Sequence, residues 1–178
     1  NWSGGEVPTE NVNVIIPVVS YLPVISTTTQ ADCHNLDIQS GATLTVESDG
    51  SGTGSLIVTG SSTGNVTCYR QMRTETNDGD YHYFSSPVAS NSETNSTKAD
   101  VVWQWNEVTG GWTTLAMTAL QSGTGYNLDQ SAESDGLLMF TGPLVTESVS
   151  IDATSPYSDI TDGTESDYLA GRDIADGS

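Results

Sequence analysis

The chain has 178 residues, of which 35% are hydrophobic, and 23 acidic residues against four Lys or Arg give a formal net charge of −19. This charge disfavours nucleic acid as a partner, because phosphate binding requires a basic surface, and it disfavours anionic membrane surfaces for the same reason. No apolar run approaches the ~20 residues that a membrane-spanning helix needs, so membrane insertion is not expected.

Residues 1–69 contain a repeat in their apolar pairs. Two series recur at steps of 20 or 22 residues, namely Leu22/Val24, Leu44/Val46 and Val66/Cys68, and Val14/Ile16, Leu36/Ile38 and Leu56/Val58. Glycine-containing stretches at 39–41, 48–52 and 60–64 supply turns between them. The pattern predicts three stacked coils of a short parallel β-helix. An ordinary β-meander with accidental spacing is the alternative.

Beyond residue 69 the period is lost, and short strands alternate with glycine-rich turns. Strands are expected at 82–85, 101–105, 112–115, 125–128, 137–141 and 147–151. Such spacing is typical of an antiparallel β-sandwich. We therefore predict an all-β chain with β-helix-like coils over 1–69 and a sandwich-like half over 70–178, which could also form one continuous module. The acidic segment 152–178 is expected to be loop.

The tryptophans gather in one predicted hairpin. Trp103 and Trp105 alternate with Val102 and Gln104, so the two rings share one face of a strand, and Trp112 begins the second arm. That face is either core or a platform for sugar rings. Core packing is the preferred interpretation for Trp103 and Trp105, because tryptophan buries a large apolar area, whereas both interpretations stay open for Trp112.

Several segments, taken in order, resemble a module that is common in secreted and surface proteins of Bacteroidetes. They are NWSGGEVPTENVNVIIP, CHNLDIQSGATLTV, SLIVTGSSTGNVTCYRQM, YHYFSSPV, VWQWNEVTGGWT, SGTGYNL and MFTGPL. The resemblance implies export by the type IX secretion system and a secreted or cell-surface location. It also implies neighbouring domains that degrade polysaccharides or belong to adhesin-like proteins. It suggests carbohydrate binding and supplies no catalytic residues.

The candidate ligand contacts are aromatic, polar and cationic side chains near the hairpin. The aromatic ones are Trp112, Tyr126, Tyr81 and Tyr83, the polar ones Asn106, Glu107 and Gln104, and the cationic ones Arg70 and Arg73. Guanidinium groups bind sulfate or uronate in bidentate fashion. Pairing of the two arginines with the nearby acids Glu75, Asp78 or Asp80 is the alternative to ligand binding, and it is the preferred interpretation.

Calcium is the ion that the sequence favours. Asp78 and Asp80 flank a glycine in Asn77-Asp78-Gly79-Asp80, a spacing that suits oxygen-ligand loops, and the segment 159–167 is a second candidate. An acidic turn in solvent is the alternative for both. Zinc is not expected, because neither histidine belongs to a metal-binding motif. Cys33 and Cys68 are expected to be free thiols in apolar surroundings.

These observations favour a non-catalytic extracellular module that binds polysaccharide, of algal or plant origin for example. A structural or adhesion spacer of a surface protein is the first alternative. A fragment of a polysaccharide lyase or hydrolase is the minor one, with Arg70, Arg73, Tyr81, His82 and Tyr83 as the residue types that a lyase would use. No Ser-His-Asp motif supports a hydrolytic triad.

Overall fold

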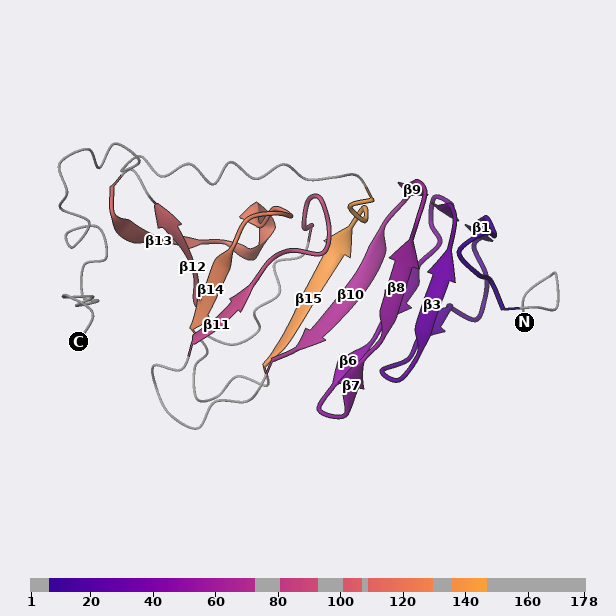
Figure 1. Ribbon diagram of the computed structural model, residues 1–178, viewed down its shortest axis with the longest axis horizontal. Helices are drawn as coiled ribbons and strands as arrows, with labels where there is room; N and C mark the ends of the chain where they lie inside the picture. The colour runs from indigo at the N-terminus through magenta and orange to yellow at the C-terminus, as the bar shows by residue number, and fades with distance from the viewer. Residues whose placement is uncertain (1–6, 73–80, 93–100, 107–108, 130–135, 147–178) are drawn as a thin grey trace, which may run out of the picture.

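The computed structural model describes residues 7–72, 81–92, 101–106, 109–129 and 136–146, and they are all-β, which confirms the predicted class. The strands are β1 Val14–Ile16, β2 Val24–Ile25, β3 Gln30–Cys33, β4 Leu36–Ile38, β5 Leu44–Val46, β6 Ser48–Asp49, β7 Gly52–Thr53, β8 Ser55–Val58, β9 Ser62–Thr63, β10 Val66–Gln71, β11 Tyr81–Phe84, β12 Val101–Asn106, β13 Gly111–Leu115, β14 Tyr126–Asp129 and β15 Leu137–Gly142. In Figure 1 the strands follow one another along the long axis, from β1 at one end to the β12–β13 hairpin at the other.

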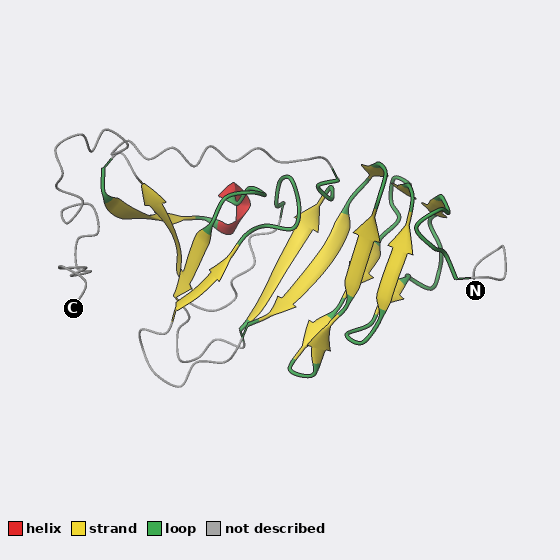
Figure 2. Ribbon diagram, viewed as in Figure 1, coloured by secondary structure: helices red, strands yellow, loops and turns green. Residues whose placement is uncertain are grey.

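Helix is almost absent from the described part of the chain. Figure 2 shows one short helical turn, which is the 3-10 helix Met117–Ala119. None of the described residues forms a helix that is long and apolar enough to cross a membrane.

The first half consists of strands that pair in parallel with strands further along the chain. The parallel sets are β1-β4-β9, β2-β5-β10 and β3-β8. Val14 lies opposite Leu36, and Leu44 lies opposite Val66, which are the 22-residue steps that the sequence predicts. The buried apolar residues of β1 lie level with those of β4, and those of β5 lie level with buried residues of β2 and β10.

The stacked strands enclose one apolar core. Its buried members are Val14, Ile16, Ile25, Cys33, Leu36, Ile38, Leu44, Val46 and Val66. They come from strands of all three parallel sets, which therefore share this core. The alternation of buried and exposed residues in β1 and β4 is the period-2 pattern of a half-buried strand.

The predicted register is wrong for β2. Val24 pairs with Thr45, so Ile25 is the residue that lies level with Val46 and is buried, whereas Leu22 and Val24 are exposed. A shift of one residue reverses which side chains point inward. The sequence 22–25 is apolar at three of its four positions, so its composition does not fix this register.

The predicted partner of Leu56 and Val58 is also wrong. Both residues belong to β8, which pairs with β3, while β4 pairs with Ser62 and Thr63 of β9. The cause is the antiparallel β6–β7 hairpin, which lengthens this repeat to 26 residues between Leu36 and Ser62. The link from β9 to β10 is shorter than the link from β4 to β5. As a result, Val66 of β10 again lies 22 residues after its partner, Leu44 of β5.

Two of the predicted turns depend on a left-handed glycine. Gly41 has a φ of +83° and Gly64 a φ of +78°. A Cβ atom on Gly64 would also overlap the backbone oxygen of Ile38, so space as well as conformation requires glycine there.

Strand β10 joins the two halves. It pairs in parallel with β5 through Val66 to Cys68, and antiparallel with β15 over its whole length. The division expected between residues 69 and 70 therefore falls inside a single strand, and the sheet order β15-β10-β5-β2 is continuous across it.

The second half contains a four-stranded antiparallel sheet in the order β11-β14-β12-β13. The tryptophan hairpin has the predicted pairing, with Trp105 opposite Trp112 and Trp103 opposite Thr114. This sheet packs on β10 and β15 around a second core, in the manner of a sandwich. The buried side chains of that core are Met72, Val88, Val102, Met117, Leu120, Tyr126, Leu128, Leu138 and Phe140. The strand expected at 147–151 and the acidic segment after it lie outside the described residues.

Candidate ligand-binding face

The outer face of the β11-β14-β12-β13 sheet collects the aromatic residues of this sheet that do not enter the core. Tyr83, Asn127 and Trp103 lie level with one another on three neighbouring strands. Residues directly opposite on neighbouring strands point to the same side of a sheet, and so do residues two apart on one strand. The name aromatic face is used here for the aromatic side chains on this side together with Asn127, which are those of Tyr81, Tyr83, Trp103, Trp105, Trp112 and Asn127.

Most of the rings on the aromatic face are open to solvent. Tyr83 is 75% exposed and Trp112 is 46% exposed, and Tyr81 and Trp105 are exposed as well. The rings of Trp105 and Trp112 meet edge to face with their centroids 5.3 Å apart. This contact holds the two indoles together across the hairpin.

Five of these residues line a shallow hollow of about 340 Å³. Its lining consists of Tyr81, Tyr83, Trp103, Trp112 and Asn127. Since neighbouring strands are ~4.8 Å apart, Tyr83 and Trp103 stand ~10 Å from each other on either side of Asn127. The hollow therefore has aromatic walls and an amide between them.

Asn127 is the polar residue within this row. It is only 5% exposed, and its Oδ1 atom is buried without a hydrogen-bond partner. Sequence reasoning missed this residue, although a signal was present. Asn127 alternates with the buried Tyr126 and Leu128, so period 2 assigns it to the side opposite the core.

The structure corrects the preferred interpretation of Trp103 and Trp105. Their strand turns Val102 into the core, where it is 2% exposed, and turns both tryptophans outward. Alternation predicted correctly that the two indoles share a face. It did not indicate which face is buried, because valine and tryptophan are both common in cores.

Tyr126 does not lie on the aromatic face, so its predicted role as a ligand contact is wrong. It is 3% exposed and packs against Phe84, with ring centroids 5.7 Å apart. Its hydroxyl oxygen accepts a hydrogen bond from the Gln121 backbone N–H at 2.9 Å. A buried tyrosine with a satisfied hydroxyl is a core residue.

The predicted polar contacts Gln104 and Asn106 project from the other side of β12. Gln104 lies opposite Thr113, and both line a separate hollow of about 310 Å³ with Trp105 and Asn106. Asn106 Oδ1 accepts a hydrogen bond from the Thr109 backbone N–H at 3.1 Å, which supports the hairpin turn. Glu107 lies outside the described residues.

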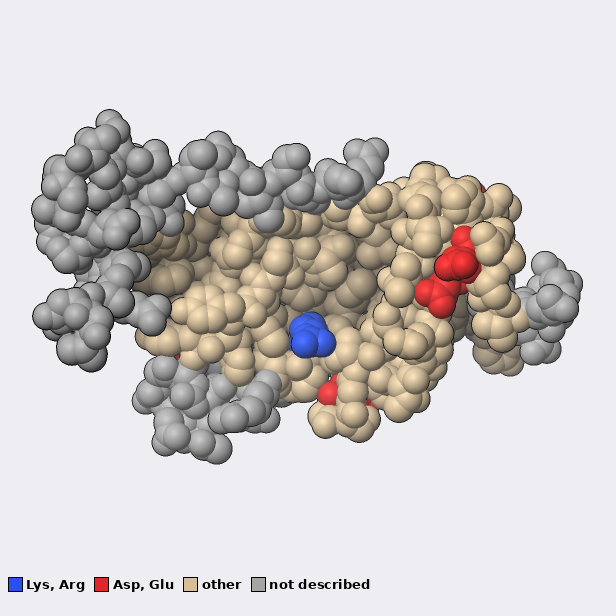
Figure 3. All heavy atoms as spheres, viewed as in Figure 1, with Lys and Arg blue, Asp and Glu red and all other residues tan. Residues whose placement is uncertain are grey.

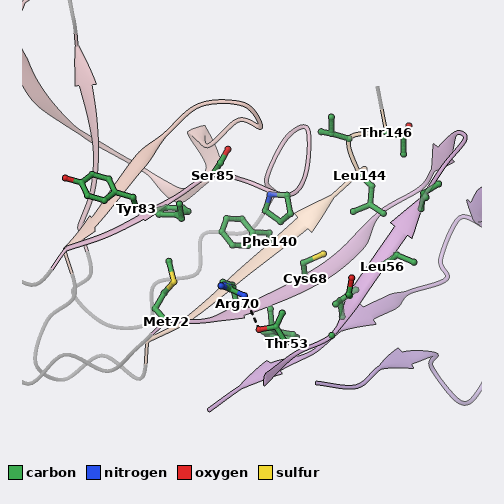
Figure 4. A pocket seen from close by; sticks show the side chains of 18 residues that line it. Thr53, Leu56, Cys68, Arg70, Met72, Tyr83, Ser85, Phe140, Leu144 and Thr146 are labelled. Atoms are coloured by element: carbon green, nitrogen blue, oxygen red, sulfur yellow. Dashed lines mark hydrogen bonds between the residues drawn. The ribbon is translucent and has the colours of Figure 1, made fainter. Parts of the chain in front are cut away.

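Arg70 lies in a different place, a groove of about 540 Å³ between the two halves of the molecule. In Figure 4 its side chain reaches Thr53, and Nη1 donates a hydrogen bond to Thr53 Oγ1 at 3.1 Å. Cys68, Phe84 and Phe140 form part of the apolar wall. Tyr83 lines both this groove and the hollow of the aromatic face.

Arg70 is the only Lys or Arg in the part of the chain that the structure describes. In Figure 3 the blue atoms form one isolated spot, while red atoms gather over the parallel strands and at the β6–β7 hairpin. Within the described ranges Arg70 has no ion pair, and Arg73 and its predicted acidic partners lie outside them. Of the lyase residue types, Arg70 and Tyr83 share the groove, whereas Tyr81 and His82 do not line it.

Both cysteines are free thiols, as predicted. Burial raises the pKa of Cys68 to about 11. Burial also raises the pKa of Cys33, and the nearby Asp32 carboxylate adds a smaller increase. Neither thiol is therefore activated as a nucleophile at neutral pH.

Among the described residues, no group of three or more His, Cys, Asp or Glu side chains is placed to hold a metal ion. The predicted calcium ligands Asp78 and Asp80 lie outside those residues, as does the segment 159–167. One acidic turn is described, in the β6–β7 hairpin. There Asp49 accepts hydrogen bonds from Ser51 Oγ at 2.6 Å and Ser51 N at 2.7 Å, which lower the pKa of its carboxyl group.

No protein-family model, curated protein or solved structure matches this chain. The function proposed below is therefore argued from the aromatic face, the groove and the sequence.

Proposed function

We propose that this chain is a non-catalytic extracellular module that binds polysaccharide through the aromatic face. The observation that carries the proposal is the set of exposed rings on one side of a rigid sheet, of which Tyr83 and Trp112 are the most open. Aromatic rings pack well on the C–H faces of sugar rings, and those of tyrosine and tryptophan also carry a polar edge for hydroxyl groups. A soluble domain rarely exposes so many large rings together without a partner.

The position of the rings suits an extended ligand better than a small enclosed one. The hollow is shallow and lies between strands β11 and β13, with Trp105 continuing the row beyond it. Side chains on strands are held more precisely than those on loops. A polymer chain can therefore lie across several rings without ordering the protein first, which limits the entropic cost of binding.

The sequence resemblance supports the same assignment and adds a setting. We propose a secreted or cell-surface location in a Bacteroidetes protein exported by the type IX system. The neighbouring domains would be polysaccharide-degrading or adhesive. Calcium bound by Asp78 and Asp80 stays part of this proposal, and a rise in melting temperature with calcium that Asp78→Asn abolishes would support it.

The test is retention on a glycan panel in affinity electrophoresis, combined with a scan for new reducing ends and unsaturated sugars. We expect retention without turnover for the unmodified chain, and at least a tenfold weaker affinity for Tyr83→Ala and Trp112→Ala. Tyr21→Ala is the matched control, because Tyr21 is 93% exposed and lies in the first half. Equal loss in all three variants, or retention of none of the glycans, would contradict the proposal.

The same assay also tests the catalytic alternative. Turnover of any polysaccharide would show an enzyme fragment and direct attention to the groove, where Arg70 and Tyr83 lie together. An Arg70→Gln variant would then lose turnover. For a binding module we expect this variant to retain full affinity, because Arg70 is not on the aromatic face.

A role as a structural or adhesion spacer is the second candidate, and a specific observation favours it. Of the 13 exposed large hydrophobic residues in the described part of the chain, eight lie within residues 7–24. The strands of this region, β1 and β2, each have one described neighbour and so present an edge. Exposed edges and apolar side chains together favour contact with another domain or chain.

Sedimentation velocity separates this candidate from a freely monomeric module. If the β1–β2 edge joins domains, the isolated chain should self-associate with rising concentration, and Leu22→Ser with Tyr21→Ser should weaken that association. A monomer at every concentration would argue against an adhesive edge.

A further inference from the structure

The groove between the two halves is a concave site that glycan binding at the aromatic face does not use. Its volume of about 540 Å³ lies within the usual range of small-molecule sites. The groove follows the seam between the two cores, because Cys68 and Leu144 line it and pack against both of them. Strands β10 and β15 supply part of its lining and pair with each other over their whole length, so these side chains are held on a rigid support.

Much of the wall of the groove is apolar. Half-buried side chains contribute to it, among them those of Leu56, Cys68, Phe84 and Leu144. In Figure 4 Leu56 lies on one side of Cys68, and Phe140 lies on the other side. These half-buried side chains keep apolar surface that the two cores do not cover. Removing such surface from water is favourable, so the wall suits the apolar part of a ligand.

Arg70 gives the groove a positive charge. Its side chain is exposed, and its Nη1 donates a hydrogen bond to Thr53 Oγ1 at 3.1 Å. A guanidinium group has five N–H donors, so donors remain for a ligand. The described residues that line the groove include no Asp or Glu, although the chain has 23 of them. The groove therefore differs in charge from the rest of this acidic molecule.

The acid of the adjoining β6–β7 hairpin does not neutralise Arg70. Asp49 does not line the groove, and its Oδ1 accepts hydrogen bonds from Ser51 and Gly52 within its own turn. A guanidinium group binds a carboxylate through two parallel hydrogen bonds. Because the net charge of −19 repels anions in general, an anion is expected to bind where a positive group and an apolar wall act together.

We propose that the groove is a second binding site, and that its ligand is an organic carboxylate with an apolar chain. The carboxylate group pairs with the guanidinium group of Arg70, and the apolar chain lies along the wall that includes Leu56 and Phe84. Both parts of the ligand are required, because the charge alone or the chain alone meets only half of the site. The proposal goes beyond glycan binding at the aromatic face and does not depend on it.

Titration calorimetry with decanoate, decanol and acetate tests both parts of the ligand. We expect decanoate to bind at least tenfold more tightly than decanol, which lacks the charge, or acetate, which lacks the chain. Arg70→Gln should weaken decanoate binding at least tenfold and leave decanol binding unchanged. Arg70→Lys, which keeps the charge without the planar fork, should retain more affinity than Arg70→Gln. Arg172→Gln is the matched control, because it removes the same charge at another position and should bind decanoate as the unmodified chain does.

A thiol readout tests whether the probe lies in the groove. In Cys33→Ala the remaining thiol is Cys68, which lines the groove. Saturating decanoate should slow the alkylation of Cys68 at alkaline pH, where Arg70 keeps its charge, and acetate should not. Adding Arg70→Gln should abolish this protection. Because Arg70 is exposed, the same substitution should leave the melting temperature nearly unchanged, which separates loss of binding from loss of structure.

Four outcomes would overturn the proposal. Equal affinity for decanoate and decanol would show adsorption on apolar surface, and equal losses in Arg70→Gln and Arg172→Gln would show an effect of net charge alone. Decanoate binding that leaves Cys68 alkylation unchanged would place the probe elsewhere. Absence of decanoate binding is the result expected if carboxylates of the chain itself occupy the groove. Glycan retention uses other probes and other variants, so the failure of one site is distinguishable from the failure of the other.

Discussion

At the residue scale, the thiol of Cys68 is the titratable group that the fold changes most among those with a resolved shift. It lines the groove between the halves, and burial raises its pKa from an ordinary 9.0 to about 11. The folded protein therefore holds this proton more tightly than the unfolded chain does. The resulting stability is fully present below pH 9 and is lost as the pH rises toward 11.

This gives a pH-dependent prediction. Between pH 8 and pH 11 the unmodified chain should lose roughly 2 kcal/mol more unfolding free energy than Cys68→Val, which has no thiol to ionise. Urea unfolding of both proteins across this range measures the difference. Thiolate absorbance of Cys33→Ala, in which Cys68 is the remaining thiol, reports the pKa directly. Ionisation already complete at pH 9 would contradict the described burial.

Gly64 allows a sharp test of backbone geometry. Gly64→Ala should destabilise by ~1–3 kcal/mol, because alanine is strained at a φ of +78° and its Cβ would overlap Ile38. Gly50→Ala is the matched control, since a Cβ there meets no atom within 4 Å, and it should change stability by no more than ~0.5 kcal/mol. Chemical denaturation measures the stability of both variants. Equal losses of stability would contradict the backbone geometry described for the 60–64 turn.

Of the aromatic face, the sequence identified Tyr81, Tyr83 and Trp112 as candidate contacts, but it did not identify the other members. Tyr81, Tyr83 and Trp112 could be chosen because aromatic residues beside turns and polar neighbours are often accessible. Tyr126 could not be rejected, because its burial depends on Phe84 and Phe140, which are distant in the chain and adjacent only in the fold. The unpaired carbonyl of Asn127 could not be recognised from the sequence, because it depends on the surroundings of the residue and not on its type.

At the element scale, the spacing of apolar pairs predicted which strands stack wherever the loops between them have equal length. The 22-residue steps gave the pairing of β1 with β4 and of β5 with β10. The prediction failed at β8 and β9, because the β6–β7 hairpin shifts the following strands. Ser48 and Thr53 close that hairpin through a hydrogen bond of 2.6 Å between their hydroxyl groups, a contact that polar loop composition does not reveal.

Leu44 tests the stacking itself. It is buried in β5, between β2 and β10, so Leu44→Ala should open a cavity that both neighbours share and destabilise by ~2–5 kcal/mol. Ile57→Ala is the control, because Ile57 is exposed on β8 and its loss should cost less than ~1 kcal/mol. Urea unfolding at neutral pH measures both. A cost below ~1 kcal/mol for Leu44→Ala would contradict the stacked arrangement.

At the scale of the whole molecule, β10 is the element that makes the two halves dependent on each other. Its Val66 belongs to the first core, and its partner strand β15 supplies Leu138 and Phe140 to the second. The sequence placed a division between residues 69 and 70 because the repeat ends there. Composition could not show that one strand would join the two halves.

A shared strand predicts cooperative unfolding. Calorimetry should show a single thermal transition, and Leu44→Ala in the first core and Leu138→Ala in the second should lower the temperature of that same transition. Two separate transitions, each sensitive to one of these variants, would show that the halves fold as independent domains.

The most direct test of the central claim is acrylamide quenching of tryptophan fluorescence, in a Trp2→Phe background, with and without the glycan that is retained most strongly. Trp105 and Trp112 are exposed, so we predict strong quenching in the free protein and marked protection when the glycan is added. Tyr83→Ala should show the same quenching when free and less protection at equal glycan concentration. Glycan binding that leaves the quenching unchanged would place the ligand elsewhere on the molecule and contradict the aromatic face as the binding site.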